Sequence, residues 1–317
     1  MQSFAYKVRS ELCRTGVQRL CCARAEAYGV LLFANTFSAR EVRIITENPE
    51  FASRLPKLFH RAFSLKFDTV PEDDTRGKLI FRITDPDKLH RIINQFGYDP
   101  RQSFAQHVNF AMVEDECCRA SFLRGAFLSG GSVTDPEKRY HLELATSHIQ
   151  ASREVSALLT EMGFVPHTVM RGASSVIYFK QSEHIEDFLT TIGAPVSAMD
   201  IMTAKVDKEI RNRTNRAFNC DMANMEKSLD AARGQLSAIE RLRDRGTLDD
   251  LPEKLRQTAL LRLEYPELSL QDLARRCVPP VSKSCINHRI RKLMELAEEK
   301  NSREPEDAPA LSQNDEK

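Results

Sequence analysis

The 317-residue chain has no apolar run approaching the roughly 20 residues that a membrane-spanning helix needs. It also lacks a basic start followed by an apolar stretch and a small-residue cleavage site. We therefore expect a protein that stays in the cytoplasm and has no membrane partner. In that reducing compartment the eight cysteines are expected to be thiols, not a disulfide framework.

Several signatures of enzymes are missing as well. There is no Gly-rich phosphate loop, and His107, His141 and His148 have no spacing typical of a metal-ligand set or a catalytic dyad. We expect no catalytic residue, no cofactor, no bound metal and no small-molecule substrate.

The chain has little excess charge of either sign, because its net charge is only +1. The footprint of a nucleic-acid binder is a local patch, so the distribution matters more than the sum. Residues 205–216 hold five Lys/Arg against two acids, and residues 281–292 hold four Lys/Arg, one His and no acid. Either stretch alone indicates no more than a solvated face.

An internal repeat is present at a spacing of 96 residues. Cys21 and Cys22 recur as Cys117 and Cys118, Gly29 recurs as Gly125, and Gly97 recurs as Gly193, with the copies at about 20–110 and 117–200.

Each copy has the same order of hydrophobic patterns: helix, strands, amphipathic helix, strand, helix. The expected elements of the first copy are a helix over 23–37, a strand over 41–46 and a helix over 49–63; those of the second are a helix over 119–129, strands at Val133 and 141–146, and a helix over 152–162. Glycines 97 and 193 end the closing helices. The sequence predicts an α+β domain with pseudo-twofold symmetry.

The leading helix of each copy is apolar with small residues such as Gly29 and Gly125. We expect the two helices to pack closely at the pseudo-twofold axis. The segment LRGAFLSGGSV, residues 123–133, resembles the first-helix motif LAGLIDADG of the homing-endonuclease family. In that family the last acid of the motif holds the metal ions that cut DNA, and Ala34 and Gly130 stand at those positions here. The resemblance therefore implies the fold without nuclease activity.

The last third of the chain is predicted to be helical. A single apolar stripe runs through residues 221–242, a second helix covers 251–264, and Ser269 begins a short helix over 270–277. After the break VPPVS, Ser282 begins a helix over 283–298. A short helix, a turn and a longer basic helix form the order of a helix-turn-helix.

The final helix predicts a DNA-reading face. Its apolar residues Ile286, Ile290, Leu293 and Ala297 fall on one side. The candidate DNA contacts are Ser282, Lys283, Ser284, Asn287, His288, Arg289, Arg291 and Lys292. Asn suits adenine and Arg suits guanine, whereas Lys283 and Arg289 are placed to contact phosphate. An ordinary solvated surface helix is the alternative.

The repeat, NRAFNCDMAN and PPVSKSCINHRIRKL together resemble the WhiA family of bacterial sporulation and cell-division regulators. The resemblance implies a transcription regulator, associated with the nucleoid, that binds double-stranded promoter DNA through the second domain and acts in cell division and chromosome segregation. The resemblance leaves the protein partner open, with a second regulator or RNA polymerase as the candidates. Cys285 stands where that family usually has Gly.

The predicted organisation is a LAGLIDADG-like repeat domain over 1–204, a basic linker over 205–221, a helical DNA-binding domain over 222–300 and a disordered tail over 301–317. The linker is either a DNA-facing arm or an extended, solvated connection. The paired cysteines are expected to serve as small buried side chains, with a four-sulfur zinc site as the alternative if the two helices begin side by side. An adaptor between chromosome and division machinery is the alternative function.

Overall fold

The computed structural model describes residues 2–17, 19–72, 77–98 and 106–299. The chain divides into two compact units, Met1–Arg211 and Asn212–Lys317. The tail over 301–317, predicted to be disordered, lies outside the described residues. No helix in the described ranges is both long and apolar enough to cross a membrane.

Unit 1 is built on the repeat. The first copy contributes α2 (Leu20–Leu32), β1 (Thr36–Phe37), β2 (Val42–Thr46), α3 (Pro49–Phe63), β3 (Leu79–Ile83) and α4 (Pro86–Gln95). The second contributes α5 (Glu116–Gly130), β4 (Gly131–Val133), β5 (Leu142–Thr146), α6 (Ile149–Glu161), β6 (His167–Arg171), β7 (Ser174–Phe179) and α7 (Ser182–Ile192). A one-turn 3-10 helix, Phe110–Val113, joins the copies. The predicted α+β class is confirmed, and the elements follow the predicted order except for the additional strand β6.

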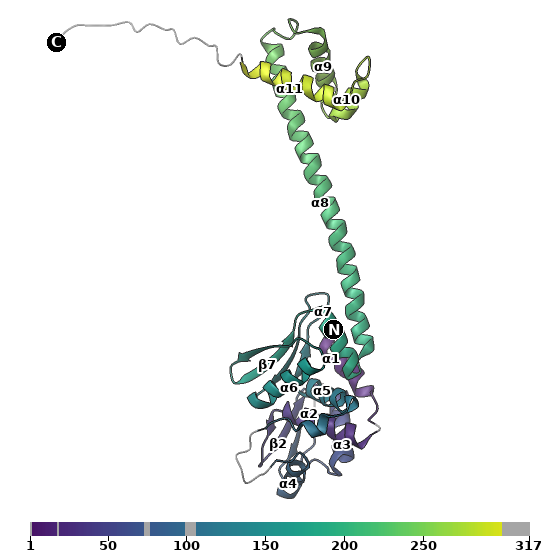
Figure 1. Ribbon diagram of the computed structural model, residues 1–317, viewed down its shortest axis with the longest axis vertical. Helices are drawn as coiled ribbons and strands as arrows, with labels where there is room; N and C mark the ends of the chain where they lie inside the picture. Colours follow the sequence, from purple (N-terminus) through teal and green to yellow (C-terminus); the bar gives the residue numbers. More distant parts are fainter. Residues whose placement is uncertain (1, 18, 73–76, 99–105, 300–317) are drawn as a thin grey trace, which may run out of the picture. The chain divides into compact units, whose positions relative to one another are not determined.

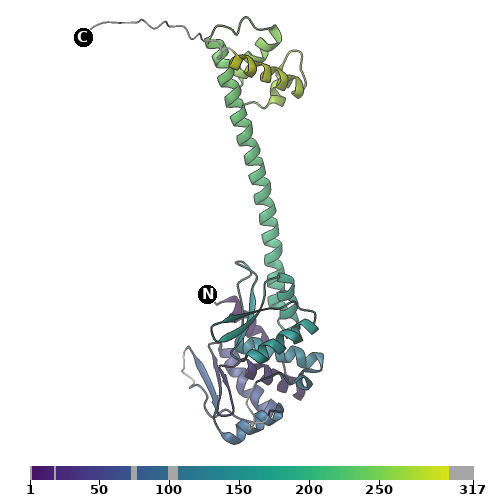
Figure 2. The ribbon, with the colours of Figure 1, turned by 60° about the vertical axis from the view of Figure 1, so that its left-hand side comes forward.

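Each copy forms its own antiparallel sheet, ordered β1-β2-β3 in the first and β4-β5-β7-β6 in the second. Both views of unit 1 show the strands of the two sheets toward one side of the paired helices α2 and α5 (Figures 1 and 2). In β2 and β5 alternate residues are buried, because one face of each sheet covers the core and the other does not.

Helices α2 and α5 form the centre of unit 1, as their small residues predict. A Cβ atom added at Gly29 would lie 2.0 Å from the carbonyl oxygen of Phe122, and one added at Gly125 would lie 2.0 Å from the carbonyl oxygen of Glu26. The two glycines occupy equivalent repeat positions, so the close approach is symmetric. No larger residue fits at either position without moving the backbones apart.

Three details of unit 1 differ from the sequence prediction. The helix expected over 23–37 ends at Leu32, because the apolar residues that follow belong to a buried turn and to β1, which pairs with β2. Strand β6 was not predicted, since all five of its residues are exposed and show no apolar alternation. Helix α1 (Phe4–Arg14) precedes the repeat and buries Val8 and Leu12 in the same core.

The linker expected over 205–221 is not an extended connection. It lies within α8 (Pro195–Asp244). Between Pro195 and Gly234 no proline or glycine interrupts the chain, and Lys, Glu, Arg, Ala and Met are good helix formers. The stretch is largely exposed, as its charge predicts, and its run of good helix formers makes it helical.

Unit 2 takes the end of α8 and adds α9 (Glu253–Glu264), α10 (Leu270–Arg276) and α11 (Lys283–Glu299). Its core lies among Ile239 and Leu242 of α8, Ala259 of α9, and Ile290 and Leu293 of α11. The apolar stripe predicted along α8 is buried at Ala232, Ile239 and Leu242 and exposed at Met222, Met225 and Leu229. Only the last part of that stripe therefore belongs to the core.

Candidate nucleic-acid interface

The helix-turn-helix consists of α10, the turn over 277–282 and α11. Ser269 begins α10, and its hydroxyl accepts a hydrogen bond from the amide of Asp272 at 3.2 Å. Ser282 begins α11 in the same way, accepting from the amide of Cys285 at 3.2 Å. The amide of Val281 donates to the carbonyl of Ala274 at 3.0 Å, which fixes the turn against α10. Both caps predicted from the sequence are present.

A buried arginine that sequence reasoning missed positions α10. Arg262 on α9 is 2% exposed. Its guanidinium donates to Oε1 of Gln235 at 3.1 and 2.7 Å and to the carbonyls of Pro266 and Leu268 at 3.3 and 2.6 Å. Burial lowers the pKa of Arg262. The side chain thus holds the loop before α10 to α8, and no sequence pattern distinguishes it from a solvated helix arginine.

The two faces of α11 separate as predicted. Ile286, Ile290, Leu293 and Ala297 are all buried. The residues expected to touch DNA lie away from them, and Ser282, Lys283, Ser284, Asn287, His288, Arg291 and Lys292 are exposed. Cys285 is half-buried and leaves the helix regular. A contiguous polar surface therefore follows the first three turns of α11.

Arg289 is the exception, because it is only half-buried. Its positive charge lies close enough to the Cys277 thiol to oppose the effect of burial, which raises the pKa of that thiol. Arg289 thus leans toward the turn before α11. Arg289 is therefore less accessible to a partner than the exposed residues of α11.

One acid limits the positive charge of the surface. Glu295 lies 3.3 Å from Nε of Arg291 and 3.3 Å from Nζ of Lys292. The Lys292 ammonium, followed by Arg291, holds the pKa of Glu295 below its usual value. Arg291 remains 79% exposed. Such solvent-screened surface pairs contribute little to stability, so a phosphate or a guanine can displace the carboxylate.

Ala34, just after α2, and Gly130, the last residue of α5, lie at the ends of the paired helices in unit 1, and neither carries a carboxylate. Ala34 is buried, and a Cβ atom added at Gly130 would lie 2.4 Å from the carbonyl oxygen of Ala145. A buried ion-pair cluster joins α2 and α5. Glu26 accepts from Arg54 at 2.6 and 2.9 Å and from Arg124 at 3.0 Å. The three charged side chains therefore hold α2, α3 and α5 together.

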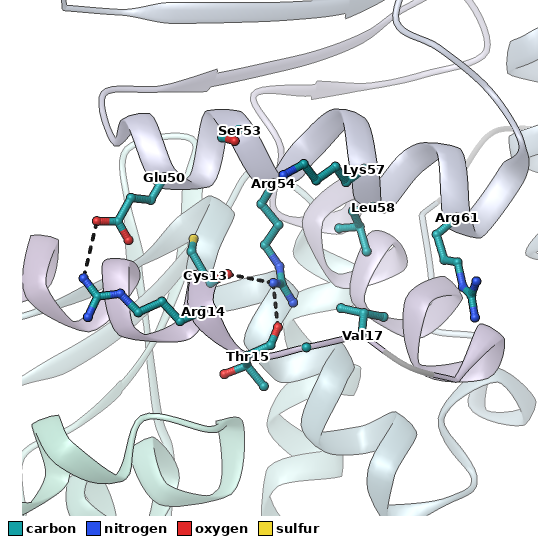
Figure 3. Close-up of a pocket in the computed structure, with 11 residues that line it drawn as sticks. Cys13, Arg14, Thr15, Val17, Glu50, Ser53, Arg54, Lys57, Leu58 and Arg61 are labelled. Atoms are coloured by element: carbon teal, nitrogen blue, oxygen red, sulfur yellow. Dashed lines mark hydrogen bonds and ion pairs between the residues drawn. The ribbon is translucent and has the colours of Figure 1, made fainter.

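A surface pocket beside this cluster lies between α1 and α3 (Figure 3). Arg54 points across it, and its guanidinium also donates to the carbonyls of Cys13 and Thr15 at 3.0 and 2.7 Å. Arg14 and Glu50 pair at 3.9 Å on its rim. The pocket is basic, but its central arginine already makes four hydrogen bonds to three residues, so the geometry is that of a packing contact between helices.

The fold and the exposed face of α11 define a class: a LAGLIDADG-like domain followed by a helical helix-turn-helix domain. Two family models match the chain. The WhiA LAGLIDADG-like domain matches residues 119–211, and the WhiA C-terminal HTH domain matches residues 214–297.

Relatives that match over most of the chain carry the same family name. A protein of Ruminiclostridium cellulolyticum named "Probable cell division protein WhiA" is 35% identical over 308 residues, 93% of this chain and 97% of the relative. A protein of the same name from Carboxydothermus hydrogenoformans is 35% identical over 302 residues, with 93% and 97% covered. The chain belongs to the WhiA family.

A solved structure shares the fold. The crystal structure of full-length DUF199/WhiA from Thermatoga maritima matches with a TM-score of 0.58 at 22% identity, over 94% of this chain and 99% of that one. The helix-turn-helix domain and the LAGLIDADG-like domain predicted from the sequence are both confirmed.

Proposed function

We propose that this protein is a sequence-reading DNA-binding regulator of transcription that acts in cell division and chromosome segregation. The observation that carries the proposal is the exposed polar face of α11, which is held by a capped turn and backed by a buried apolar face. Asn287 and Arg291 lie four residues apart on one side of α11, so they face the same stretch of a major groove. The cell-division role rests on the printed names of the relatives.

The roles of the remaining face residues follow from their positions. Ser282, Lys283 and Ser284 surround the N-terminus of α11, where amides and the helix dipole favour phosphate. His288 lies beside Asn287 and is placed at a base edge or a phosphate, and Lys292 lies with Arg291 near the middle of the helix. Promoter DNA is the proposed partner, with a second regulator or RNA polymerase as protein partners, and the nucleoid is the proposed location.

Binding of the full-length protein to duplexes of genomic promoter sequence tests the proposal. Wild type is compared with Arg291→Ala and with Arg233→Ala, which removes an arginine of similar exposure from α8. We expect Arg291→Ala to cost about 1 to 3 kcal/mol of discrimination between promoter and scrambled duplexes, and Arg233→Ala to leave it unchanged. Equal loss in both variants would contradict the proposal.

A second candidate, an adaptor that works mainly through protein contacts, is favoured by the exposed apolar side chains of Phe218, Met222, Met225 and Leu229 on α8. Because its DNA contacts would be to phosphate alone, binding would fall steeply with salt and would show little sequence preference. Repeating the binding measurement at two salt concentrations separates the two candidates.

We also infer that unit 1 does not cut DNA. Divalent-metal hydrolysis needs carboxylates to hold the cations, and Ala34 and Gly130 supply none. The contact of 2.4 Å from an added Cβ at Gly130 to the Ala145 carbonyl supports this, since an aspartate there would collide with backbone. Plasmid DNA incubated with the protein and Mg²⁺ or Mn²⁺ should stay supercoiled, and Gly130→Asp should destabilise unit 1 without creating nicking. Metal-dependent nicking by purified wild type would refute this inference.

A further inference from the structure

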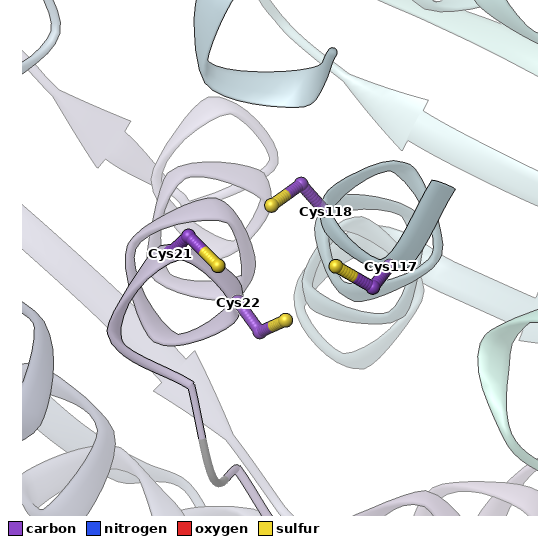
Figure 4. A group of neighbouring side chains, drawn as sticks. All are labelled: Cys21, Cys22, Cys117 and Cys118. Atoms are coloured by element: carbon purple, nitrogen blue, oxygen red, sulfur yellow. The ribbon is translucent and has the colours of Figure 1, made fainter. Parts of the chain in front are cut away.

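Four cysteine side chains meet where α2 and α5 begin (Figure 4). Their Sγ atoms all lie within 4.8 Å of one another. They come as two adjacent pairs, Cys21 with Cys22 and Cys117 with Cys118, one pair from the first turn of each helix. The two helices begin side by side, which is the arrangement that a shared site between the repeats requires.

Burial of small side chains, the role expected from the sequence, does not account for the cluster. Only Cys118 is buried, and Cys21 is exposed. All four are free thiols. An exposed thiol gains nothing from packing, so the convergence of four sulfurs needs another explanation.

The donor set and its spacing suit a soft tetrahedral cation. Structural zinc takes four thiolates at about 2.3 Å, which places the sulfurs about 3.8 Å apart. The observed upper limit of 4.8 Å exceeds that by about 1 Å, a change that rotation of exposed and half-buried Cys side chains can supply. Four protein ligands leave no open position, so such a site is structural and not catalytic.

The surroundings favour the negative charge of a tetrathiolate centre. Neither Arg19 nor Asp115, which precede α2 and α5, makes a side-chain cap hydrogen bond. No capping side chain therefore offsets the positive ends of the two helix dipoles, which both lie at the cluster. The Arg19 guanidinium lies 3.9 Å from Sγ of Cys117. Asp115 and Glu116 are exposed to solvent, which screens their opposing charges.

We propose that Cys21, Cys22, Cys117 and Cys118 bind one zinc ion that ties the first turns of the two repeats together. Four zinc–sulfur bonds form as the four thiols release their protons to solvent, and no electrons are transferred. Since the ligands come from both copies, binding stabilises the packed pair α2 and α5 and leaves the surface of α11 untouched.

The test is the metal content of the full-length protein, purified under reducing conditions without chelator and measured by mass spectrometry of the element. The double variant Cys22→Ser/Cys117→Ser removes one ligand from each helix. Its matched control, Cys220→Ser/Cys285→Ser, removes two cysteines outside the cluster. We expect about one zinc per chain in wild type and control and a loss of most of it in the cluster variant.

Two further readouts keep the test valid if the double variant folds poorly. Cys21→Ser changes an exposed side chain, so it should fold and still lose zinc. Co²⁺ added to zinc-free wild type should give thiolate-to-metal charge-transfer bands that Cys21→Ser weakens. Absence of stoichiometric zinc in wild type, equal loss in the control, or an intact mass showing disulfides across the cluster would each overturn the proposal.

Discussion

The two units use their characteristic residues in opposite ways. In unit 1 the repeated residues Gly29 and Gly125 lie at the contact between α2 and α5, where the two copies are packed together. In unit 2 the characteristic residues, such as Asn287, lie on an exposed face that contacts nothing the protein needs for folding. The characteristic residues of α2 and α5 are buried and serve to pack the helices, whereas those of α11 are exposed and are available to a partner.

The largest effect should come from removing the buried carboxylate of unit 1. Glu26→Ala leaves the guanidinium groups of Arg54 and Arg124 without their anion, so we expect it to lower the free energy of unfolding by about 3 to 5 kcal/mol. Glu161→Ala, which removes the 58% exposed partner of Arg119, should cost less than about 1 kcal/mol. Denaturant unfolding followed by circular dichroism measures both. Similar costs for the two variants would mean that the cluster is not a buried anchor.

The contact between α2 and α5 is expected to give the second largest change in stability. Gly125→Ala places a Cβ atom against the Glu26 carbonyl, and we expect a loss of about 1 to 3 kcal/mol or more. The matched change Gly234→Ala on α8, where an added Cβ meets nothing within 4 Å, should raise stability by about 0.5 to 1 kcal/mol. Thermal unfolding of each full-length variant gives the comparison. A Gly125→Ala protein as stable as wild type would contradict the close approach of α2 and α5 at this position.

The smallest effect concerns the acid beside the proposed DNA contacts. Glu295→Ala frees Arg291 and Lys292 from a surface ion pair, so DNA binding should tighten by up to about fivefold. Stability should hardly change. Glu240→Ala, an exposed acid on α8, is the control. Titration of fluorescent duplex at low salt measures the change, and weaker binding by Glu295→Ala would place DNA elsewhere.

Patterns with a clear physical signature were predictable from the sequence. The repeat spacing identified α2 and α5 as partners, and the caps at Ser269 and Ser282 located α10 and α11 to within one residue at their starts. β-Branched residues and the alternation of apolar with polar residues located β2 and β5. In each case a local rule and the tertiary environment agree.

What the sequence did not predict depends on tertiary contacts or lacks periodicity. Strand β6 is wholly exposed, so it shows no alternation. The role of Arg262 depends on Gln235, which is 27 residues away along the chain. The sulfur cluster, which the paired cysteines predicted only as an alternative, requires both repeats to begin side by side, and no local pattern encodes that distance. Contacts between distant residues therefore account for most of what was missed.

The most direct test of the account is a selection of preferred duplexes from a random pool by full-length wild type and by Asn287→Ala at equal salt. The account predicts a defined motif for wild type and, for Asn287→Ala, the same motif relaxed at one adenine-containing position, with about 1 to 3 kcal/mol less discrimination there. An unchanged motif in the variant, or no motif in wild type, would contradict the claim that this face of α11 reads DNA.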